Sequence, residues 1–370
     1  MNKIARLILA SGESSPDMRY AAGFSTPDEF LYFSTDRERG VICSPLEFSR
    51  AVAQARDGVT VHAEAEFGGP DRLEMLTRLA ASLGVAGYLV PADFPVLWAD
   101  RLRGRGLEVR VEEGVFFPQR EFKSSAEVDA VIRSQRAGEA GLRRAVEVLR
   151  ESEITPDRMI RWRGELLTSE ILRSEIDVAM VRLGMQPTGT ICAGGEQAAQ
   201  PHNTGSGPLR ADWPIVMDIF PRSAETGYWG DLTRTVVKGK ASELVQRAYD
   251  AVLDARELGK SLVKVGADPA EIHLAAARKM EEAGFRTGRS DKADFGFFHG
   301  LGHGVGLDIH EAPRLSPRNH TPLRGGEIVT VEPGLYYPEW GGIRLEDLMY
   351  VAPAGAARCL TEAEDFLEIP

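Results

Sequence analysis

The hydrophobic positions in the first third of the chain alternate between short apolar runs and helical stretches. Strand-length runs stand at residues 30–33, 40–43 and 88–90. Residues 71–83 instead have apolar side chains at the spacing of an amphipathic helix. This alternation predicts a small α/β domain at the N-terminal end of the chain.

A linker and a well-marked helix start follow. Residues 114–122 contain a proline and lack a periodic pattern, which predicts a linker. Ser124 and Glu127 then form the Ser-x-x-Glu pattern of a capping box ahead of a long apolar-periodic run. Because 370 residues exceed what one core usually supports, we expect two domains, residues 1–122 and 123–370.

The second domain alternates pairs of helices with strand-like segments. After the helix that starts at Ser124, helical patterns are found at residues 169–183, 242–264 and 268–284. Strand-like segments are found at residues 214–220, 232–237, 327–331 and 347–351. Two helices, a sheet region, two more helices and another sheet region predict an α/β domain of two similar halves.

The amino-acid composition and net charge disfavour some classes of binding partner. Hydrophobic residues at 43% and charged residues at 27% are ordinary for a globular protein. The net charge of −11 disfavours nucleic acid and anionic membranes as partners. Four of the acidic residues are assigned below to a cation-binding site.

Acids and histidines of the second domain concentrate beside glycines and apolar strands. Asp218 and Glu332 each follow an apolar run, and a carboxylate buried there alone would be costly without a cation. Taken singly, each acid could be a cap, a turn residue or a salt-bridge partner. Four of the seven histidines, however, share glycine- or proline-flanked loops with these acids, which favours a joint site: His202, His299, His303 and His310.

These segments resemble the metal-binding motifs of the pita-bread metallopeptidase family, which includes methionine aminopeptidases, Xaa-Pro aminopeptidases, prolidases and creatinase. The matching motifs are an Asp before a hairpin, Asp-Leu-Thr-Arg-Thr, Gly-His-Gly-Val-Gly with a His seven residues on, Glu-Pro-Gly, and Gly-Ile-Arg-Leu-Glu-Asp. They occur in the family's order, and the resemblance extends from about residue 124 to residue 349. It implies a pita-bread catalytic domain of two similar halves.

The resemblance also implies two divalent metal ions held by five side chains. Asp218 resembles the terminal ligand of one metal, and Asp231 and Glu346 resemble carboxylate bridges. His303 and Glu332 resemble the ligands of the second metal. Oxygen-rich ligation with one imidazole suits Mn²⁺ first, with Co²⁺, Zn²⁺ and Fe²⁺ as alternatives. Cations of this kind activate a water molecule for hydrolysis.

Further residues match the family outside the set of ligands. His202 and His310 resemble two outer histidines that donate to the substrate carbonyl and the developing intermediate. Glu332 also resembles the residue that moves a proton to the leaving amine. His299 and Arg344 resemble substrate-contacting residues of the proline-specific branch. For Arg344 the alternative is a structural salt bridge to one of the two acids that follow it.

The chain departs from the family at one hairpin. Asp218 and Asp231 are 13 residues apart, two more than in the usual family hairpin, and Asp-Ile-Phe stands where Asp-x-Gly is common. We expect both carboxylates to face the metals still, because a β-bulge can restore the side-chain alternation. The turn at residues 221–223 is expected to protrude beside the site.

The N-terminal domain separates the members of the family. Tyr20-Ala-Ala-Gly-Phe resembles the opening of the domain found in prolidases, Xaa-Pro aminopeptidases and creatinase, which methionine aminopeptidases generally lack. The complete ligand set argues against creatinase, which has the fold without the metal ligands. The resemblance thus implies an Xaa-Pro peptidase acting on proline-containing peptides. It also implies a homodimer in which the N-terminal domain helps to roof the partner's site.

Three alternatives stay open. Sequence motifs do not separate an Xaa-Pro dipeptidase from an Xaa-Pro aminopeptidase. A methionine aminopeptidase-like enzyme of the same fold is a second hypothesis. A non-catalytic binding paralogue is a third, although such proteins typically lose ligands and all five matching residues are retained here.

Cysteine usage and the apolar runs bear on location. The three cysteines are an odd number, widely spaced and in no metal-type pairing: Cys43, Cys192 and Cys359. A disulfide framework is therefore not expected. The apolar run at residues 7–10 is too short for a signal peptide, and the chain has no apolar stretch of about 18 residues. We expect a cytoplasmic protein.

Overall fold

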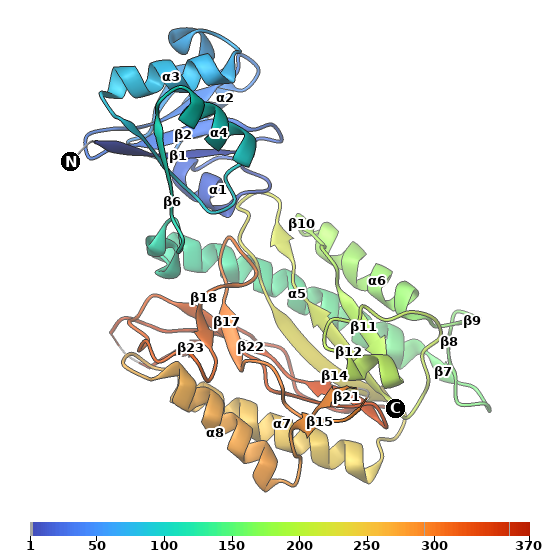
Figure 1. Ribbon diagram of the computed structural model, residues 1–370. Helices are drawn as coiled ribbons and strands as arrows, with labels where there is room; N and C mark the ends of the chain where they lie inside the picture. The colour runs from blue at the N-terminus through green and yellow to red at the C-terminus, as the bar shows by residue number, and fades with distance from the viewer. Residues whose placement is uncertain (1–2, 292, 355) are drawn as a thin grey trace. The chain divides into compact units, whose positions relative to one another are not determined.

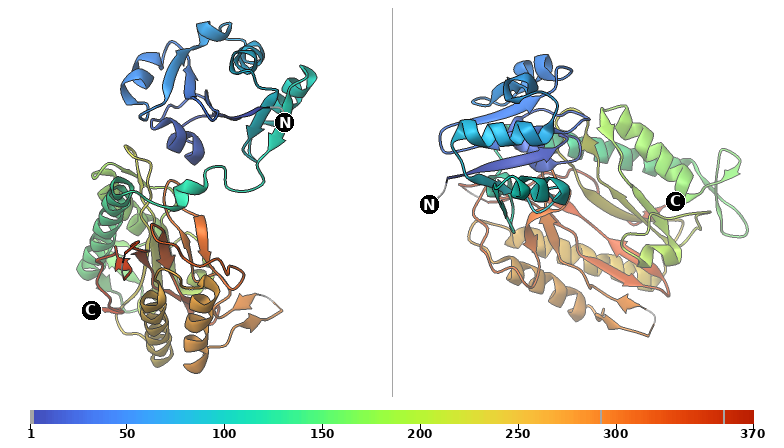
Figure 2. Two further views of the ribbon diagram at one scale, coloured as in Figure 1. Left: turned by 90° about the vertical axis from the view of Figure 1, so that its left-hand side faces the viewer. Right: turned by 45° about the horizontal axis from the view of Figure 1, so that its top comes forward.

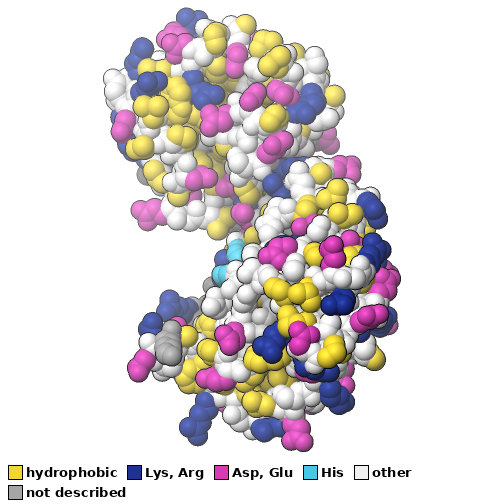
Figure 3. Space-filling view, turned by 90° about the vertical axis from the view of Figure 1, so that its right-hand side faces the viewer, with side chains coloured by type: hydrophobic (Ala, Val, Ile, Leu, Met, Phe, Trp, Pro, Cys, Tyr) yellow, Lys and Arg dark blue, Asp and Glu magenta, His cyan; other side chains and the backbone are white. Residues whose placement is uncertain are grey.

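The computed structural model describes residues 3–291, 293–354 and 356–370. By its internal contacts the chain divides into two compact units, Met1–Arg120 and Glu121–Pro370 (Figure 1). None of the described helices is long and apolar enough to cross a membrane. Acidic and basic side chains are interspersed on the face shown in Figure 3, so the acidic excess is not gathered there.

The first unit is a six-stranded sheet with helices on both faces. Its strand order is β4-β3-β2-β1-β5-β6, with β1, β2 and β3 antiparallel and the other pairs parallel. The strands are β1 (Ile4–Ala10), β2 (Phe30–Ser34), β3 (Arg39–Cys43), β4 (Thr60–Ala63), β5 (Gly87–Val90) and β6 (Glu108–Val111). The helices are α1 (Pro16–Ala22), α2 (Phe48–Gln54), α3 (Arg72–Leu83) and α4 (Val96–Gly104).

Alternation along β1 explains why both faces of this sheet are covered. Leu7 belongs to a core with α3 and α4, whereas the next residue, Ile8, belongs to a second core with α1 and α2. Successive side chains of a strand point to opposite faces, so an almost wholly apolar strand needs a layer on each side. The three predicted runs are β2, β3 and β5, and the predicted helix is α3, so the expected small α/β unit is confirmed.

The second unit consists of two halves, each a helix pair packed on a sheet (Figures 1 and 2). Helices α5 (Ser125–Glu151) and α6 (Ser169–Val181) share a buried core with the sheet β11-β12-β14-β24. Helices α7 (Glu243–Leu262) and α8 (Pro269–Glu282) share another with the sheet β18-β17-β19-β22-β23. The predicted arrangement of helix pairs and sheets is therefore confirmed.

The strands of this unit place the acids and histidines. The first sheet comprises β11 (Ile191–Gly194), β12 (Pro214–Ile219), β14 (Leu232–Lys238) and β24 (Glu368–Ile369). The second comprises β17 (Gly302–Gly304), β18 (Glu311–Leu315), β19 (Ile328–Val331), β22 (Asp347–Tyr350) and β23 (Arg358–Cys359). A hairpin lies beside them, formed by β20 (Gly334–Tyr337) and β21 (Gly341–Arg344). Small peripheral strands are β7 (Glu153–Ile154), β8 (Ile160–Trp162), β9 (Glu165–Leu166), β15 (Gly288–Arg289) and β16 (Asp294–Phe295).

Local sequence signals explain the starts of two helices. The Ser124 hydroxyl accepts from the backbone N–H of Glu127, whose carboxylate accepts from the backbone N–H of Ser124 at 2.8 Å. This is the predicted capping box at the start of α5. At the start of α8, the Asp268 carboxylate accepts from the backbone N–H of Ala270 at 2.8 Å, directly ahead of Pro269 in the first turn.

The expected bulge in the hairpin from Asp218 to Asp231 is absent from the ladder of β12 and β14. Their register runs without a shift, and Asp218 pairs with Thr233. Cross-strand partners lie on one face, and Asp231 precedes Thr233 by two residues, so a regular ladder already puts both carboxylates on that face. The extra residues form β13 (Arg222–Ser223), which pairs with β10 (Met185–Gln186), rather than a free turn.

Candidate metal centre

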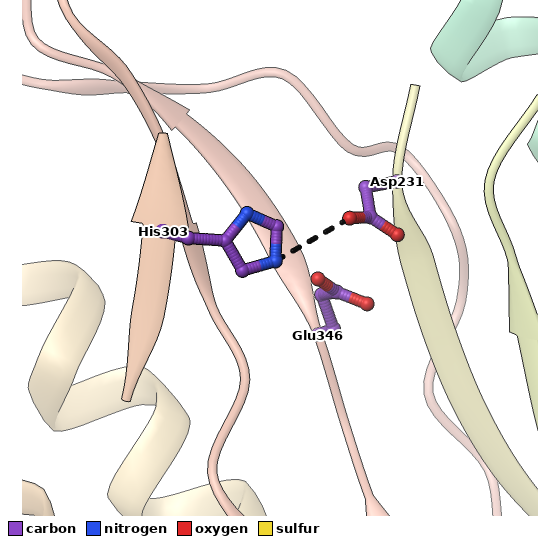
Figure 4. A group of neighbouring side chains, drawn as sticks. All are labelled: Asp231, His303 and Glu346. Carbon is purple, nitrogen blue, oxygen red and sulfur yellow. Dashed lines mark ion pairs between the residues drawn. The ribbon is translucent and has the colours of Figure 1, made fainter. Parts of the chain in front are cut away.

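Three buried side chains from both halves of the second unit converge at one point (Figure 4). Asp231 precedes β14, His303 lies in β17, and Glu346 joins β21 to β22. Their donor atoms all lie within 4.8 Å of one another. The His303 Nε2 atom is 3.7 Å from the Asp231 carboxylate. Carboxylate oxygens and an imidazole nitrogen at such distances form a donor set for a metal ion.

Two glycines allow the strand of His303 to pass close to its neighbours. A Cβ atom on Gly302 would lie 2.0 Å from the carbonyl oxygen of Thr330, and one on Gly304 would lie 2.1 Å from that of Ala312. Any larger residue would push the strand away. The glycines of this motif are thus required by close packing of backbones beside the site.

The hydrogen bonds of His303 orient its ring. Nδ1 lies 3.2 Å from the carbonyl oxygen of Gly304, which can only accept, so Nδ1 carries a proton. The backbone N–H of His303 donates to the Thr330 hydroxyl at 3.0 Å. With Nδ1 as donor, Nε2 is the ring nitrogen that faces the acids, and it is the atom that could bind a metal ion.

Asp218 and Glu332 lie at the edge of this group, each at the end of an apolar strand. Asp218 accepts from the Thr233 hydroxyl at 3.1 Å and from the Arg344 guanidinium at 2.8 Å. Glu332 lies 3.1 Å from His303 Nε2. The Thr233 hydroxyl also lies 2.8 Å from Glu346. Thr233, which sequence reasoning left without a role, thus connects two of the predicted ligands.

The site has more acidic side chains than arginines or lysines. Burial, followed by the charges of Glu346 and Asp218, raises the pKa of Asp231 well above its usual range. Burial, followed by the charges of Glu332 and Asp218, raises the pKa of Glu346 likewise. Burial also acts to raise the pKa of Glu332, but hydrogen bonding to His303 and its charge outweigh this and lower it to about 2. Carboxylates that repel one another in this way fit divalent cations, and the oxygen-rich donor set with one imidazole suits them.

All nine predicted site residues line one cavity of about 720 Å³. The five predicted ligands are joined there by His202, His299, His310 and Arg344. Their roles as ligands, donors and substrate contacts stay predictions. The cavity also has residues that sequence reasoning missed, among them Phe220, Phe298, Ile309 and Arg314.

His310 packs against His303 at the cavity wall. The two ring centroids are 4.4 Å apart, in an edge-to-face arrangement. The protein surroundings that partly desolvate the ring, followed by the charge of His303, lower the pKa of His310 to about 4. A neutral ring at neutral pH has one N–H donor and one acceptor nitrogen, so His310 can hydrogen-bond a substrate without adding charge.

Arg344 joins the acids to His299 through a tyrosine. The guanidinium donates to the Tyr336 hydroxyl at 2.9 Å, and that hydroxyl lies 3.0 Å from His299 Nε2. The carboxylate that Arg344 contacts is Asp218, and neither of the two acids that follow Arg344 is its ion-pair partner among the described residues. Tyr336 was not predicted, because a tyrosine four residues after Glu332 has no signal of its own in the sequence.

A pita-bread architecture with acids and histidines in one cavity is typical of metal-dependent peptidases. The sequence model of metallopeptidase family M24 matches residues 129–353, more than half of the chain. The chain belongs to this family.

Named relatives and a solved structure agree with this assignment. The Xaa-Pro dipeptidase of Pyrococcus furiosus is 37% identical over 177 residues, 47% of each chain. The Xaa-Pro dipeptidase of Pyrococcus horikoshii is 32% identical over 254 residues, 66% of this chain and 67% of the relative. The crystal structure of the prolidase from Pyrococcus horikoshii OT3 superposes with a TM-score of 0.82 at 25% identity, over 99% of this chain and 95% of that one. The first of these alignments thus spans about half of its relative's length.

Proposed function

We propose that the chain is a metal-dependent peptidase that cleaves the Xaa-Pro bond. The observation that carries this proposal is the convergence of Asp231, His303 and Glu346 in a cavity large enough for a small peptide. The relatives named Xaa-Pro dipeptidase support the choice of substrate. Apolar side chains of the cavity wall, Phe220 and Phe298 among them, would suit a proline ring.

The proposed ligands are the five predicted residues. Asp231 and Glu346 would bridge two cations, with Asp218 on one side and His303 and Glu332 on the other. When bound, divalent cations would activate water and polarise the scissile carbonyl. Mn²⁺ is the proposed metal, because four carboxylates and one imidazole form a predominantly hard donor set.

Other residues would bind the substrate and move its protons. Glu332 would carry a proton to the leaving nitrogen, since its carboxylate lies beside His303 at the cavity surface. His310 and His202 would donate hydrogen bonds to the substrate carbonyl, whose oxygen gains charge as the bond breaks. His299, held by Tyr336, and Arg344 would position the peptide.

The position of Arg314 supports a dipeptide, rather than a longer peptide, as the proposed substrate. It is an exposed residue of β18 that lines the cavity, and its charge is among those that act on His310. Among the described residues it has no carboxylate partner at ion-pair distance. An arginine without an ion-pair partner in the cavity would bind the free C-terminal carboxylate of the proline in a dipeptide. We therefore propose Xaa-Pro dipeptidase activity rather than Xaa-Pro aminopeptidase activity.

Hydrolysis of three peptides by the purified protein with added Mn²⁺ tests the proposal. We expect Ala-Pro to be cleaved, Ala-Pro-Ala to be a poorer substrate and Met-Ala-Ser to be left intact. Cleavage of Met-Ala-Ser alone would favour the methionine aminopeptidase-like alternative. Absence of any hydrolysis with metal bound would favour a non-catalytic paralogue.

In the same assay, Arg314→Met should raise the KM for Ala-Pro by roughly tenfold, the effect expected when a hydrogen bond to a charged group is lost. Ala-Pro-Ala has no carboxylate at that position, so its KM should change little. Arg318→Met is the matched control, because Arg318 is an exposed arginine of the same region outside the cavity lining. An equal rise for both peptides would contradict the assignment of Arg314.

The domain boundaries, the oligomeric state and the location of the protein are also proposals. We propose that residues 1–122 form the creatinase-like N-terminal domain and residues 123–370 the catalytic domain. We also propose a homodimer, on the strength of the resemblance, and light scattering of the purified chain would test it. A cytoplasmic location is proposed from the three cysteines, which are all free in the structure.

A further inference from the structure

Arg234 and Asp347 belong to the matched motifs, yet neither has a part in the proposed chemistry. Arg234 follows Asp231 by three residues, and Asp347 directly follows Glu346. Both side chains are buried, at 3% and 4% exposure, and their ion pair is 2.8 Å long. A buried ion pair beside two proposed ligands suggests a role beyond general stability.

The guanidinium of Arg234 joins three segments of the second unit. One terminal nitrogen donates to the backbone carbonyls of Glu346 at 2.7 Å and Thr233 at 3.0 Å. The other donates to Asp347 and to the carbonyl of Ala363 at 3.0 Å. Its Nε lies 3.1 Å from the Asp365 carboxylate. All of its nitrogens are therefore engaged, and its planar fork fixes the geometry of the contacts.

Asp347 connects this arginine to helix α7. Its second oxygen lies 2.6 Å from Lys260 Nζ and 3.4 Å from Arg256 Nε. Arg256, 1% exposed, is in turn paired with Asp365, the carboxylate that Arg234 also contacts. The charges form a closed network that ties β14, the junction between β21 and β22, the C-terminal segment and α7 together.

The network acts on the segments that carry the two proposed bridging ligands. The backbone N–H of Glu346 donates to the carbonyl of Thr233 at 3.0 Å, and Arg234 binds that same carbonyl. Asp231 and Glu346 would repel each other when both are ionised, so the segments that carry them would tend to separate when no cation lies between them. Arg234 holds both segments through the carbonyls of Thr233 and Glu346.

We propose that Arg234 and Asp347 are positioning residues that keep Asp231 and Glu346 at ligand spacing and thereby set the affinity for divalent cations. This inference rests on the proposed function, because it takes those two acids as ligands. Neither Arg234 nor Asp347 lines the cavity. Partners that orient metal ligands in this way typically change metal affinity by roughly 10–100-fold when replaced.

Mn²⁺ titration of the metal-free protein by isothermal titration calorimetry tests the inference without reference to turnover. The variants are Arg234→Lys, which keeps the charge but loses the planar fork, and Asp347→Asn, which keeps the shape but loses the charge. Arg144→Lys is the control, because Arg144 of α5 pairs with Glu175 of α6 at 2.7 Å, outside the lining of the cavity and with both side chains partly exposed. Thermal unfolding of each metal-free protein reports general stability separately.

We expect both variants to bind Mn²⁺ roughly 10–100-fold more weakly than wild type, and Arg144→Lys to bind it as wild type does. If Arg234→Lys does not fold, Asp347→Asn decides the question alone. Wild-type affinity in a folded variant, with only its unfolding temperature lowered, would show a purely structural ion pair and overturn the inference. Failure of the wild-type protein itself to bind Mn²⁺ would overturn the proposed function first, and the inference with it.

Discussion

Replacing Asp231 by alanine will empty at least one cation position, whereas replacing His310 by alanine will leave the metal content near that of wild type. Asp231 is the proposed bridge between two cations, and its donor atom lies within 4.8 Å of those of His303 and Glu346. Without its carboxylate the cations lose a shared ligand. His310 contacts the ring of His303 edge-on from the cavity side, a position from which it can reach substrate.

The two variants should also differ in kinetics. His310→Ala should lower kcat by roughly 10²–10⁴, the usual contribution of a positioned proton-transfer or hydrogen-bonding group. A defect confined to KM would mean that the residue binds ground state and transition state alike. Metal analysis of the dialysed proteins and steady-state kinetics on Ala-Pro measure both effects. Complete loss of metal from His310→Ala would refute the division into ligands and outer residues.

Exhaustive removal of metal will reduce the hydrolysis of Ala-Pro to background, and added Mn²⁺ will restore it. The physical reason is the donor set, because four carboxylates around one imidazole provide no strong nucleophile of their own. Burial, followed by the charges of neighbouring carboxylates, raises the pKa values of Asp231 and Glu346, so these groups are poorly stabilised as anions without a cation. The measurement is turnover after dialysis against a chelator, with metal content determined on the same sample.

The control for metal removal is chelator already saturated with Mn²⁺, which should leave activity unchanged and so exclude inhibition by the chelator itself. Zn²⁺, Co²⁺ and Fe²⁺ added separately would rank the alternatives to Mn²⁺. Full activity in a sample shown to be free of metal would refute a metal-dependent mechanism for this chain.

Much of the fold could be predicted because its signals are local. Ser124 and Glu127 mark the start of α5 through a capping box that needs only four consecutive residues. The apolar runs before Asp218 and Glu332 mark β12 and β19, since a run of buried positions ends where a polar side chain must find a partner. Such elements can be predicted because the residues that form each pattern are all within one short segment of the chain.

Other strands could not be predicted from their own residues. β17, β20 and β21 contain glycines and lie beside turns, a composition that is typical of loops. They form strands because neighbouring backbones approach more closely than a side chain would permit, as Gly342 shows: a Cβ atom there would lie 2.0 Å from the carbonyl oxygen of Ala198. The register of β12 against β14 could not be predicted either, because it depends on how the two strands pair. That register runs without a bulge.

The sequence by itself determined the order of the elements, the metallopeptidase resemblance and the identity of nine candidate site residues. Only the tertiary structure brought those nine side chains into one cavity and revealed partners from distant segments. Tyr336 between Arg344 and His299, Arg314 in the cavity wall, and Arg234 behind Glu346 are such partners. The reason is physical: a ligand motif is a short run with fixed spacing, whereas a hydrogen-bond partner needs only the right place in space.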